Sequence, residues 1–506
     1  MRFGHGCVAV MAAVMMMMGG AAVAAEAQGV APHAGHHAAT TEKATAPQSL
    51  PPNSVTKHSI ALPGRTIAFT ATAGSIMLHS GKGKAVADIA YVAYRRDQKE
   101  TATRPVTFVF NGGPGASSAW LQLGAMGPWR MPMPGGKTYP SAPPRLVANA
   151  DTWLDFTDLV FVDPPGTGYS KIVAPGAAVR KELWSVKGDV EALAVFIRRW
   201  LAANGRMASP KFIAGESYGG FRAPLLAEKL ARAENVGITG LVMISPALDL
   251  TAMRDPNDPL TSAIRLPSYD AVRLAQKAPV TRADLTAVEA YASGPYLQDF
   301  LRGPGDQPAV ARMAAHVARI TGLNPALVKR LGGRVGMDTF VRAFYRDVGK
   351  VGAIYDATIT AYDPEPFAHH DDWLDPVLPG FKAPLASAMV DLYRNRLGWK
   401  LTANYQILND QIAQAWHWGR AMHRITALPA LRRMLALDPH FRVLVTGGLM
   451  DLVIPYYGNA LLLRQIPAYG AQKRLFFITY PGGHMFYDRA ASRAALRADA
   501  KRLIYR

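Results

Sequence analysis

The sequence predicts an α/β protein in which helices flank a mostly parallel sheet, with a largely helical segment inserted between two parts of the core. Short apolar runs that end in glycine-rich turns alternate with segments of helical periodicity, and this alternation is typical of parallel sheets. Of the 506 residues, 49% are hydrophobic, which supports a large core and excludes wholesale disorder. The alternation is interrupted over residues 251–430, so we expect a helical cap there, with the core formed by residues 56–250 and 431–506.

The expected elements follow in chain order. Residues 59–97 alternate hydrophobic and polar side chains around glycines, which predicts antiparallel hairpins. Buried strands are then expected at Val106–Phe110, Leu159–Asp163, Lys211–Ala214, Leu241–Ile244, Val443–Thr446 and Leu475–Thr479. Helices are expected over residues 186–201, where large apolar residues recur every three or four positions, and from Leu225 onward.

The first residues are typical of a targeting segment. Residues 1–25 combine Arg2, an apolar run from Val8 to Met18 and small residues after it, which predicts a cleaved secretory signal and a secreted or periplasmic protein. The run is shorter than the ~20 apolar residues of a transmembrane helix. The alternative is an ordinary apolar N-terminal segment. Residues 26–55, rich in Ala, Pro and Thr, are expected to form a flexible, disordered leader.

Charge and cysteine content narrow the choice of partners. The formal net charge of +19 could attract nucleic acid or an anionic membrane face, but the sequence has no long Lys/Arg run and no nucleic-acid motif. We therefore expect no nucleic-acid partner. Cys7 is the single cysteine, so an intramolecular disulfide and a Cys-rich zinc site are excluded. We expect no metal, no cofactor and no membrane-spanning segment in the mature chain.

A serine motif marks the first candidate catalytic group. Gly215-Glu216-Ser217-Tyr218-Gly219 lies where an expected strand meets an expected helix. A serine at the apex of such a sharp turn has a strained backbone, and glycines two residues before and after it remove Cβ atoms that would clash. Ser217 would then stand exposed at the carboxyl end of the sheet, and the Tyr218 N–H could donate to an oxyanion. The alternative is a purely structural glycine-rich turn.

A second glycine-rich loop supports this interpretation. Asn111-Gly112-Gly113-Pro114-Gly115 follows an earlier strand, at the place where hydrolases with such a serine turn put their second oxyanion donor. The Gly113 amide is the candidate donor, because a side chain there would obstruct the approach of a substrate carbonyl.

A serine hydroxyl needs a base near neutral pH, and two later loops supply candidates. His484 follows the last expected strand on a turn of small residues, and Asp451 follows the strand before it. Asp451 would hold the tautomer of His484 and stabilise its imidazolium form. The chain order Ser217, Asp451, His484 is that of the α/β-hydrolase fold, which we therefore predict.

These motifs resemble those of the serine carboxypeptidase family. The likeness covers roughly residues 80–250 and 440–490 and is weak in the cap. It rests on Asn111-Gly-Gly-Pro-Gly-x-Ser117-Ser118, on the segment from Trp153 to Tyr169, on Gly215-Glu-Ser-Tyr-Gly-Gly with Pro224 downstream, and on Gly448-x-x-Asp451 and Gly483-His484-Met485.

The resemblance implies removal of C-terminal residues from peptides through an acyl-enzyme. It also implies a set of residues that binds the substrate's terminal carboxylate, and Asn111 and Glu216 match two of its members by position. A protonated Glu216 can donate to that carboxylate, whereas an ionised one would repel it. Activity on a peptide with a free C-terminus should therefore be favoured in acid, with the pKa of Glu216 raised by burial.

One departure from the family keeps an alternative open. Relatives usually have a second glutamate at the position that equal spacing from Asn111 assigns to Ala125. This absence motivates a second hypothesis, an esterase or acyltransferase that uses the same triad. A third hypothesis, a non-catalytic binding protein on this fold, is disfavoured because every triad residue is present. The oligomeric state does not follow from the sequence.

Overall fold

The computed structural model describes residues 49–98, 103–139, 145–251, 258–368, 375–419, 424–470 and 472–506. The predicted signal over residues 1–25 and the predicted leader as far as residue 48 lie outside these ranges. Within them, no helix is both long enough and apolar enough to span a bilayer.

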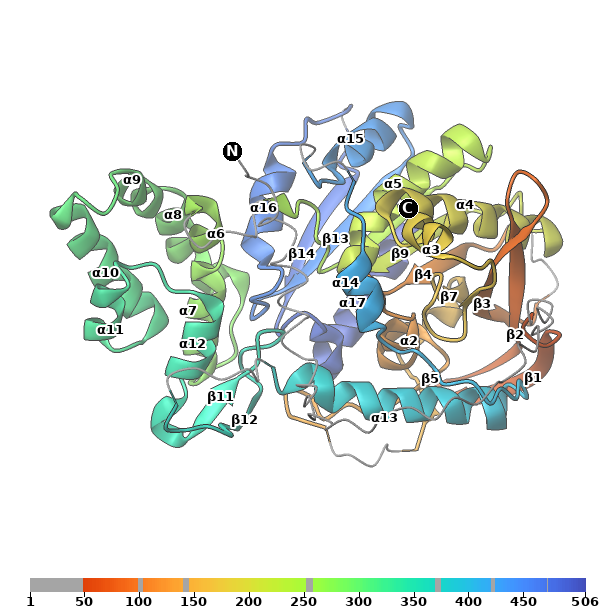
Figure 1. Cartoon of the computed structure of the whole chain (residues 1–506), viewed down its shortest axis with the longest axis horizontal. Helices are drawn as coiled ribbons and strands as arrows, with labels where there is room; N and C mark the ends of the chain where they lie inside the picture. The colour runs from red at the N-terminus through yellow and green to blue at the C-terminus, as the bar shows by residue number, and fades with distance from the viewer. Residues whose placement is uncertain are drawn as a thin grey trace, which may run out of the picture.

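One ten-stranded sheet organises the core (Figure 1). Its order is β1 (Ser54–Leu62), β2 (Arg65–His79), β3 (Ala85–Arg96), β7 (Asp158–Val162), β4 (Val106–Phe110), β9 (Lys211–Glu216), β10 (Gly240–Ile244), β13 (Arg442–Gly448) and β14 (Leu475–Tyr480), with β8 (Lys171–Ile172) beside β3. The first three strands are antiparallel, as predicted for residues 59–97, and β7 to β14 pair in parallel. The α/β-hydrolase fold class predicted from the sequence is confirmed.

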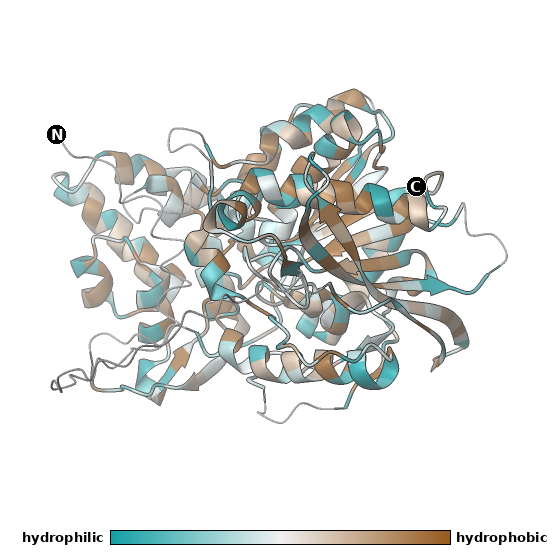
Figure 2. Cartoon of the chain, turned by 45° about the vertical axis from the view of Figure 1, so that its right-hand side comes forward, coloured by the Kyte–Doolittle hydropathy of each residue, from teal (hydrophilic) through white to brown (hydrophobic). Residues whose placement is uncertain are grey.

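The central strands β7, β4, β9 and β10 are buried along their whole length and mostly apolar, because both faces of the sheet are covered. Successive residues of β4 point to opposite faces, so Phe108 joins one hydrophobic cluster and Val109 the other. The cluster around Phe108 packs on α4 (Val186–Ala203), α5 (Tyr218–Ala233) and α15 (Leu428–Leu437). The apolar residues whose spacing predicted the helix over 186–201 lie in this cluster: Leu193, Phe196, Ile197, Trp200 and Leu201. Figure 2 shows hydrophobic residues along the strands of the sheet and on the helices that cover it.

The second cluster covers the other face and extends into the inserted segment. Core elements on this side include α17 (Ala490–Tyr505) and α16 (Tyr456–Arg464). The shorter elements of the core are α2 (Ala119–Leu121), the helical turns η1 (Gln122–Met126), η2 (Trp153–Asp155) and η7 (Phe486–Asp488), the strands β5 (Trp129–Arg130) and β6 (Val147–Ala148), and α3 (Ala177–Leu183).

The inserted segment is largely helical and has two parts. The first is a lobe, on the left of Figure 1. Its helices are α6 (Pro259–Ala263), α7 (Leu266–Ala275), α8 (Thr286–Ser293), α9 (Pro295–Leu301), α10 (Gln307–Thr321), α11 (Pro325–Arg330) and α12 (Met337–Ala343), with the turns η4 (Arg282–Leu285) and η5 (Arg346–Val348). A hairpin of β11 (Lys350–Gly352) and β12 (Thr360–Tyr362) closes the lobe and was not predicted.

The second part of the insertion returns to the core. It contains α13 (Val377–Asp391), the turn η6 (Leu392–Arg396) and α14 (Asp410–Ala415). Isolated bridges pair Leu408 with Ala116 and Gln406 with Gly168. The insertion therefore lies directly over the loops that follow β4 and β7.

The structure differs from the prediction at the end of the expected leader. Leu50 is buried, and its N–H donates to the buried Asp88 carboxylate at 2.7 Å. The Pro52 carbonyl accepts from the Trp399 indole at 3.0 Å, and β1 begins at Ser54. Distant partners thus hold the backbone at Leu50 and Pro52 against the core, while most side chains of residues 49–55 stay exposed. Composition alone does not reveal such partners.

Candidate active site

Ser217 lies on the turn between β9 and α5, as the motif predicts. Its φ of 58° and ψ of −121° place a non-glycine residue in a strained region of the backbone map. A Cβ at Gly215 would lie 2.2 Å from the Gly219 carbonyl oxygen, and one at Gly219 would lie 2.6 Å from the Phe110 carbonyl oxygen. Only glycine fits at either position. The surrounding structure therefore imposes the turn that presents Ser217.

The glycine-rich loop after β4 packs directly on this turn. A Cβ at Gly112 would lie 2.7 Å from the Tyr218 backbone nitrogen, so the loop and the start of α5 are in close contact. Gly113 has a φ of 98°, which favours glycine. Among the described residues, neither the Gly113 nor the Tyr218 N–H donates to another group. Both candidate oxyanion donors are therefore available to a ligand.

A neighbouring serine ties this loop to the sheet. The Ser118 hydroxyl donates to the Val162 carbonyl at the end of β7, and its N–H donates to the Asp163 carboxylate at 3.0 Å. Two of the motifs that carry the family resemblance thus meet through Ser118 and Asp163. Their role in the structure is to hold the glycine loop in place.

His484 and Asp451 are brought together by the loops after β14 and β13. His484 Nδ1 lies 2.6 Å from Asp451 Oδ2. The other carboxylate oxygen of Asp451 accepts the N–H groups of Val453 and Ile454, each at 2.9 Å. Since Asp451 is fully buried and acts only as an acceptor, it orients the imidazole with Nδ1 protonated and Nε2 free to act as a base.

The two loops meet at glycines, and the insertion supports them. A Cβ at Gly448 would lie 1.8 Å from the Gly483 carbonyl oxygen, which explains the glycine in each motif. The His484 N–H donates to the Tyr355 carbonyl at 2.6 Å. Tyr355 comes from the inserted segment, and its ring packs edge-on against the imidazole with centroids 5.4 Å apart. The inserted segment thus helps to position the base.

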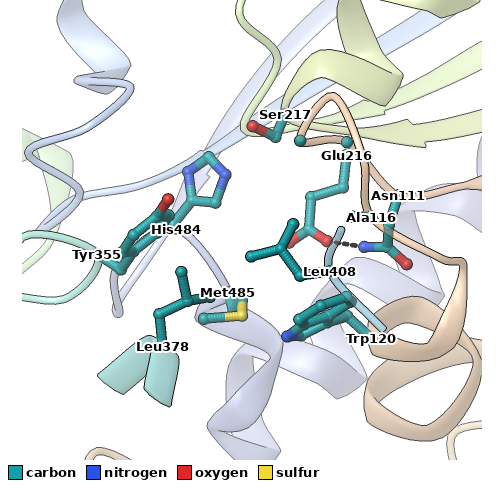
Figure 3. A pocket seen from close by; sticks show the side chains of 12 residues that line it. Asn111, Ala116, Trp120, Glu216, Ser217, Tyr355, Leu378, Leu408, His484 and Met485 are labelled. Atoms are coloured by element: carbon teal, nitrogen blue, oxygen red, sulfur yellow. Dashed lines mark hydrogen bonds between the residues drawn. The ribbon is translucent and has the colours of Figure 1, made fainter. Parts of the chain in front are cut away.

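Ser217 and His484 line one cavity that opens to solvent (Figure 3). The polar side chains of its wall come from Asn111, Glu216, Ser217 and His484. The remaining wall is formed by Gly112, Gly113, Ala116, Trp120, Tyr355, Leu378, Leu408 and Met485. Three of these, Tyr355, Leu378 and Leu408, belong to the insertion. The cavity is therefore mostly apolar, with the serine, the imidazole and the carboxyl–amide pair as its main polar groups, and it is shared between core and cap.

Glu216 is the carboxyl group of that pair. It is only 3% exposed, Asn111 Nδ2 donates to its Oε2, and the Tyr487 hydroxyl donates to Oε1 at 3.0 Å and to Oε2 at 3.1 Å. Burial raises the pKa of Glu216 to about 7, although His484 and the Tyr487 hydrogen bond oppose the increase. A carboxyl group beside the serine is therefore neutral in mild acid.

The electrostatics of His484 follow from its two acidic neighbours. Burial alone disfavours the imidazolium, but the charge and hydrogen bond of Asp451, together with the charge of Glu216, raise the pKa of His484 above its usual range. The neutral imidazole is therefore a stronger base than an ordinary histidine side chain, and it is protonated in acid.

The sequence did not identify Tyr487 or the cap residues of the cavity. Tyr487 lies three residues after His484 in an apolar stretch, and nothing in its spacing marks it. Ala125 is buried in η1 and provides no carboxyl group. Beside it, a Cβ at Gly124 would lie 2.8 Å from the Tyr487 ring, so the absent side chain there leaves room for the tyrosine.

In the described part of the chain, no cluster of three or more His, Cys, Asp or Glu residues could hold a metal ion.

Comparisons with known proteins agree with the motif resemblance. A family model described as serine carboxypeptidase matches residues 66–257, which include Asn111, Glu216 and Ser217 but not Asp451 or His484. The predicted resemblance is confirmed over that range.

Individual relatives match only part of their length. Serine carboxypeptidase-like 11 of Arabidopsis thaliana is 27% identical over 200 residues, covering 37% of this chain and 43% of the relative. Pheromone-processing carboxypeptidase KEX1 of Yarrowia lipolytica is 32% identical over 149 residues, covering 29% and 22%. The match thus spans less than half of each relative. The crystal structure of proline iminopeptidase from Mycobacterium smegmatis aligns with 85% of this chain and 98% of its own, with a TM-score of 0.37 and 13% identity.

Proposed function

We propose that this chain, which resembles serine carboxypeptidases over residues 66–257, is a serine-type carboxypeptidase that cleaves C-terminal peptide bonds through an acyl-enzyme. One observation carries the proposal. A buried carboxyl group, Glu216, lines the same cavity as Ser217 and His484, and its pKa of about 7 keeps it neutral in acid. In this proposal a nucleophile, its base and a donor for a carboxylate would face one bound substrate.

The first half of the reaction uses the serine and its base. His484 Nε2 accepts the proton of Ser217 Oγ as Oγ bonds to the carbonyl carbon of the last peptide bond. The N–H groups of Gly113 and Tyr218 donate to the oxyanion that develops. When the intermediate collapses, the C–N bond breaks and His484 gives its proton to the leaving amine. The C-terminal amino acid departs, leaving an ester on Ser217.

The second half restores the enzyme. Water takes the place of the departed amine, and His484 accepts one of its protons as the oxygen attacks the ester carbonyl. The second intermediate collapses with release of the shortened peptide, and the proton on His484 returns to Ser217 Oγ. The enzyme regains its starting protonation state.

Asn111 and Glu216 would give the enzyme its preference for peptides with a free C-terminus. The Asn111 amide and a neutral Glu216 can each donate a hydrogen bond to a terminal carboxylate, whereas an ionised Glu216 places a like charge beside it. The cavity wall around them is apolar, so an unpaired carboxylate there would be poorly solvated. A peptide whose C-terminus is an amide lacks the negative group that these donors would bind.

The test compares two peptides of one sequence, one ending in a free carboxylate and the other in an amide. Products are followed by mass spectrometry in acidic and in alkaline buffer, with Ser217→Ala as the inactive control. We expect sequential loss of C-terminal residues from the free peptide in acid, and much slower cleavage of the amide. Equal rates on both peptides would reject the carboxypeptidase proposal.

An esterase or acyltransferase with the same triad is the second candidate. The observation that favours it is Ala125, because the expected second carboxyl group is absent. Rapid turnover of small esters without peptide cleavage, abolished by Ser217→Ala, would identify this activity.

We also propose that the protein is exported. The support is the pattern of residues 1–25, in which a positive residue precedes an apolar run and small residues. N-terminal sequencing of the protein purified from the medium or periplasm tests this. A start near residue 26 is expected, and an intact N-terminus inside the cell would contradict it.

A further inference from the structure

We infer that Tyr487 is the positioning residue for the Glu216 carboxyl group, and that this pair sets the pH range in which the enzyme requires a free C-terminus. The inference rests on the proposed function, because it concerns how the carboxylate of a peptide substrate is recognised. It assigns a role to a residue that none of the sequence motifs includes.

The hydrogen-bond geometry around Glu216 carries the inference. The Tyr487 hydroxyl lies 3.0 and 3.1 Å from the two carboxyl oxygens, so it bridges them rather than binding one. Asn111 is the other donor, and its own Oδ1 accepts the Leu121 N–H at 3.0 Å. Glu216 is therefore fixed from two sides, by an amide from the loop after β4 and by a phenol from η7.

The Tyr487 hydroxyl stays protonated and so remains a hydrogen-bond donor. Its ring is fully buried, and burial together with the charge of Glu216 raises its phenol pKa far above the ordinary value. The phenol therefore keeps its proton across the range in which Glu216 titrates. Its backbone is held by Arg493, whose Nη1 donates to the Tyr487 carbonyl at 3.1 Å.

The neighbouring turn provides space for the ring. A Cβ at Gly124 in η1 would lie 2.8 Å from Tyr487 Cε2. Glycine at this position thus allows the phenol to reach Glu216. The side chain of the next residue, Ala125, is a methyl group and offers no polar contact to Glu216. A tyrosine from the histidine loop supplies the second polar contact to Glu216 at this site.

A phenol that donates to a carboxylate stabilises the ionised form more than the neutral one. Without it, Glu216 would hold its proton to higher pH. The titratable groups that interact with Glu216 are His484, Asp451, Tyr355 and Tyr487. Among these groups, Tyr487 is the one that hydrogen-bonds to the Glu216 carboxyl group. Removing its hydroxyl therefore changes the local hydrogen bonding without changing any formal charge.

The test is the pH profile of kcat/KM for a free-carboxylate peptide with Tyr487→Phe. We expect the alkaline limb of this profile, where kcat/KM declines as Glu216 ionises, to move to higher pH by about one unit. This is the size expected for the loss of one hydrogen bond to a charged group. The KM at mildly acidic pH should rise while kcat changes little, because the carboxyl group is then oriented by Asn111 alone. Tyr269→Phe is the matched control, since this buried phenol donates to the Val335 carbonyl in the cap.

Two further variants test the role of Tyr487 independently of whether Tyr487→Phe folds. Glu216→Gln cannot ionise, so it should remove the alkaline limb, and adding Tyr487→Phe to it should produce no further shift. Gly124→Ala should displace the ring while keeping the phenol, and should move the limb in the same direction as Tyr487→Phe. This variant keeps the inference testable if Tyr487→Phe does not fold.

A limb that stays in place in Tyr487→Phe and in Gly124→Ala overturns the role of Tyr487 while leaving the proposed carboxypeptidase intact. A shift of the same size in Tyr269→Phe would also reject it. If the wild-type enzyme shows no preference for a free C-terminus at any pH, the proposed function fails and the inference fails with it.

Discussion

Glu216 and His484 line the same cavity, and each favours the charged form of the other. The negative charge of Glu216 contributes to the raised pKa of His484, and the positive charge of His484 opposes the rise in the pKa of Glu216. The proposed reaction needs both groups neutral. The state with both groups neutral carries one titratable proton, on Glu216. The ion pair of imidazolium and carboxylate also carries one, on His484, so the two forms differ only in which residue holds the proton.

This relationship predicts a pH profile that depends on the substrate. Glu216 is neutral below its pKa of about 7, so kcat/KM for a free-carboxylate peptide should fall as pH rises through that value. In acid, protonation of His484 should lower the rate for every substrate. An amide-ended or ester substrate should keep its activity above neutral pH. Stopped assays of matched substrates across the pH range check this, and identical alkaline limbs for both would contradict it.

Removal of the nucleophile is expected to abolish turnover without unfolding the protein. Ser217→Ala should lower kcat by ~10⁴–10⁶ and prevent labelling by a fluorophosphonate. The melting temperature should change little, because the substitution removes only a hydroxyl that faces the cavity. A variant that keeps a tenth of the wild-type rate would exclude Ser217 as the nucleophile.

Asp451 is expected to act through the histidine. Asp451→Asn should leave the loop folded but favour the wrong imidazole tautomer, with a loss in kcat of ~10⁴. The KM should change much less than kcat, since Asp451 lies behind His484 as seen from the substrate. Kinetics on an ester substrate measure this, and a change confined to KM would show that Asp451 has another role.

The oxyanion site can be tested at a glycine that contacts it. A Cβ in Gly112→Ala would approach the Tyr218 nitrogen to 2.7 Å and obstruct its N–H. We expect kcat to fall by about 10²–10³, the usual effect of losing one such donor. Gly237→Ala is the matched control, because a Cβ there has no atom within 4 Å. Comparable activity of the two variants would argue against Tyr218 as a donor.

Burial of Glu216 should cost stability at neutral pH. Its folded pKa of about 7 exceeds the ordinary 4.5, so the folded state holds a proton that the unfolded state releases between these values. The free energy of unfolding should therefore decline with rising pH across this window, and Glu216→Gln should remove up to about 3 kcal/mol of that decline. Denaturant titrations at both ends of the window measure it. Parallel curves for wild type and variant would indicate that folding does not raise the pKa of Glu216.

Local patterns predicted most of the core. Val106–Phe110 and Leu241–Ile244 are strands because continuous apolar runs suit a sheet covered on both faces, and the glycines around Ser217 required a sharp turn. Those constraints act between residues close in sequence or within one motif. They could therefore be inferred without knowledge of distant parts of the chain.

The parts that could not be predicted depend on distant contacts. Leu50 is ordered because Asp88 accepts its N–H, and Tyr355 reaches His484 only because the insertion folds back over the core. Tyr487 has no periodicity that reveals its bonds to Glu216, and its place becomes visible only with Gly124 beside it. Side chains that complete a cavity from several loops leave no spacing signal in one sequence.

Trapping the acyl-enzyme tests the central claim most directly. A peptide with a free C-terminus is mixed with the enzyme at mildly acidic pH, the reaction is quenched in acid, and intact mass and peptide mapping locate any adduct. The account predicts a mass increase on Ser217 equal to the mass of the shortened peptide minus one water, and no adduct in Ser217→Ala. Release of the C-terminal residue with Ser217 unmodified, and with full activity retained in Ser217→Ala, would contradict it.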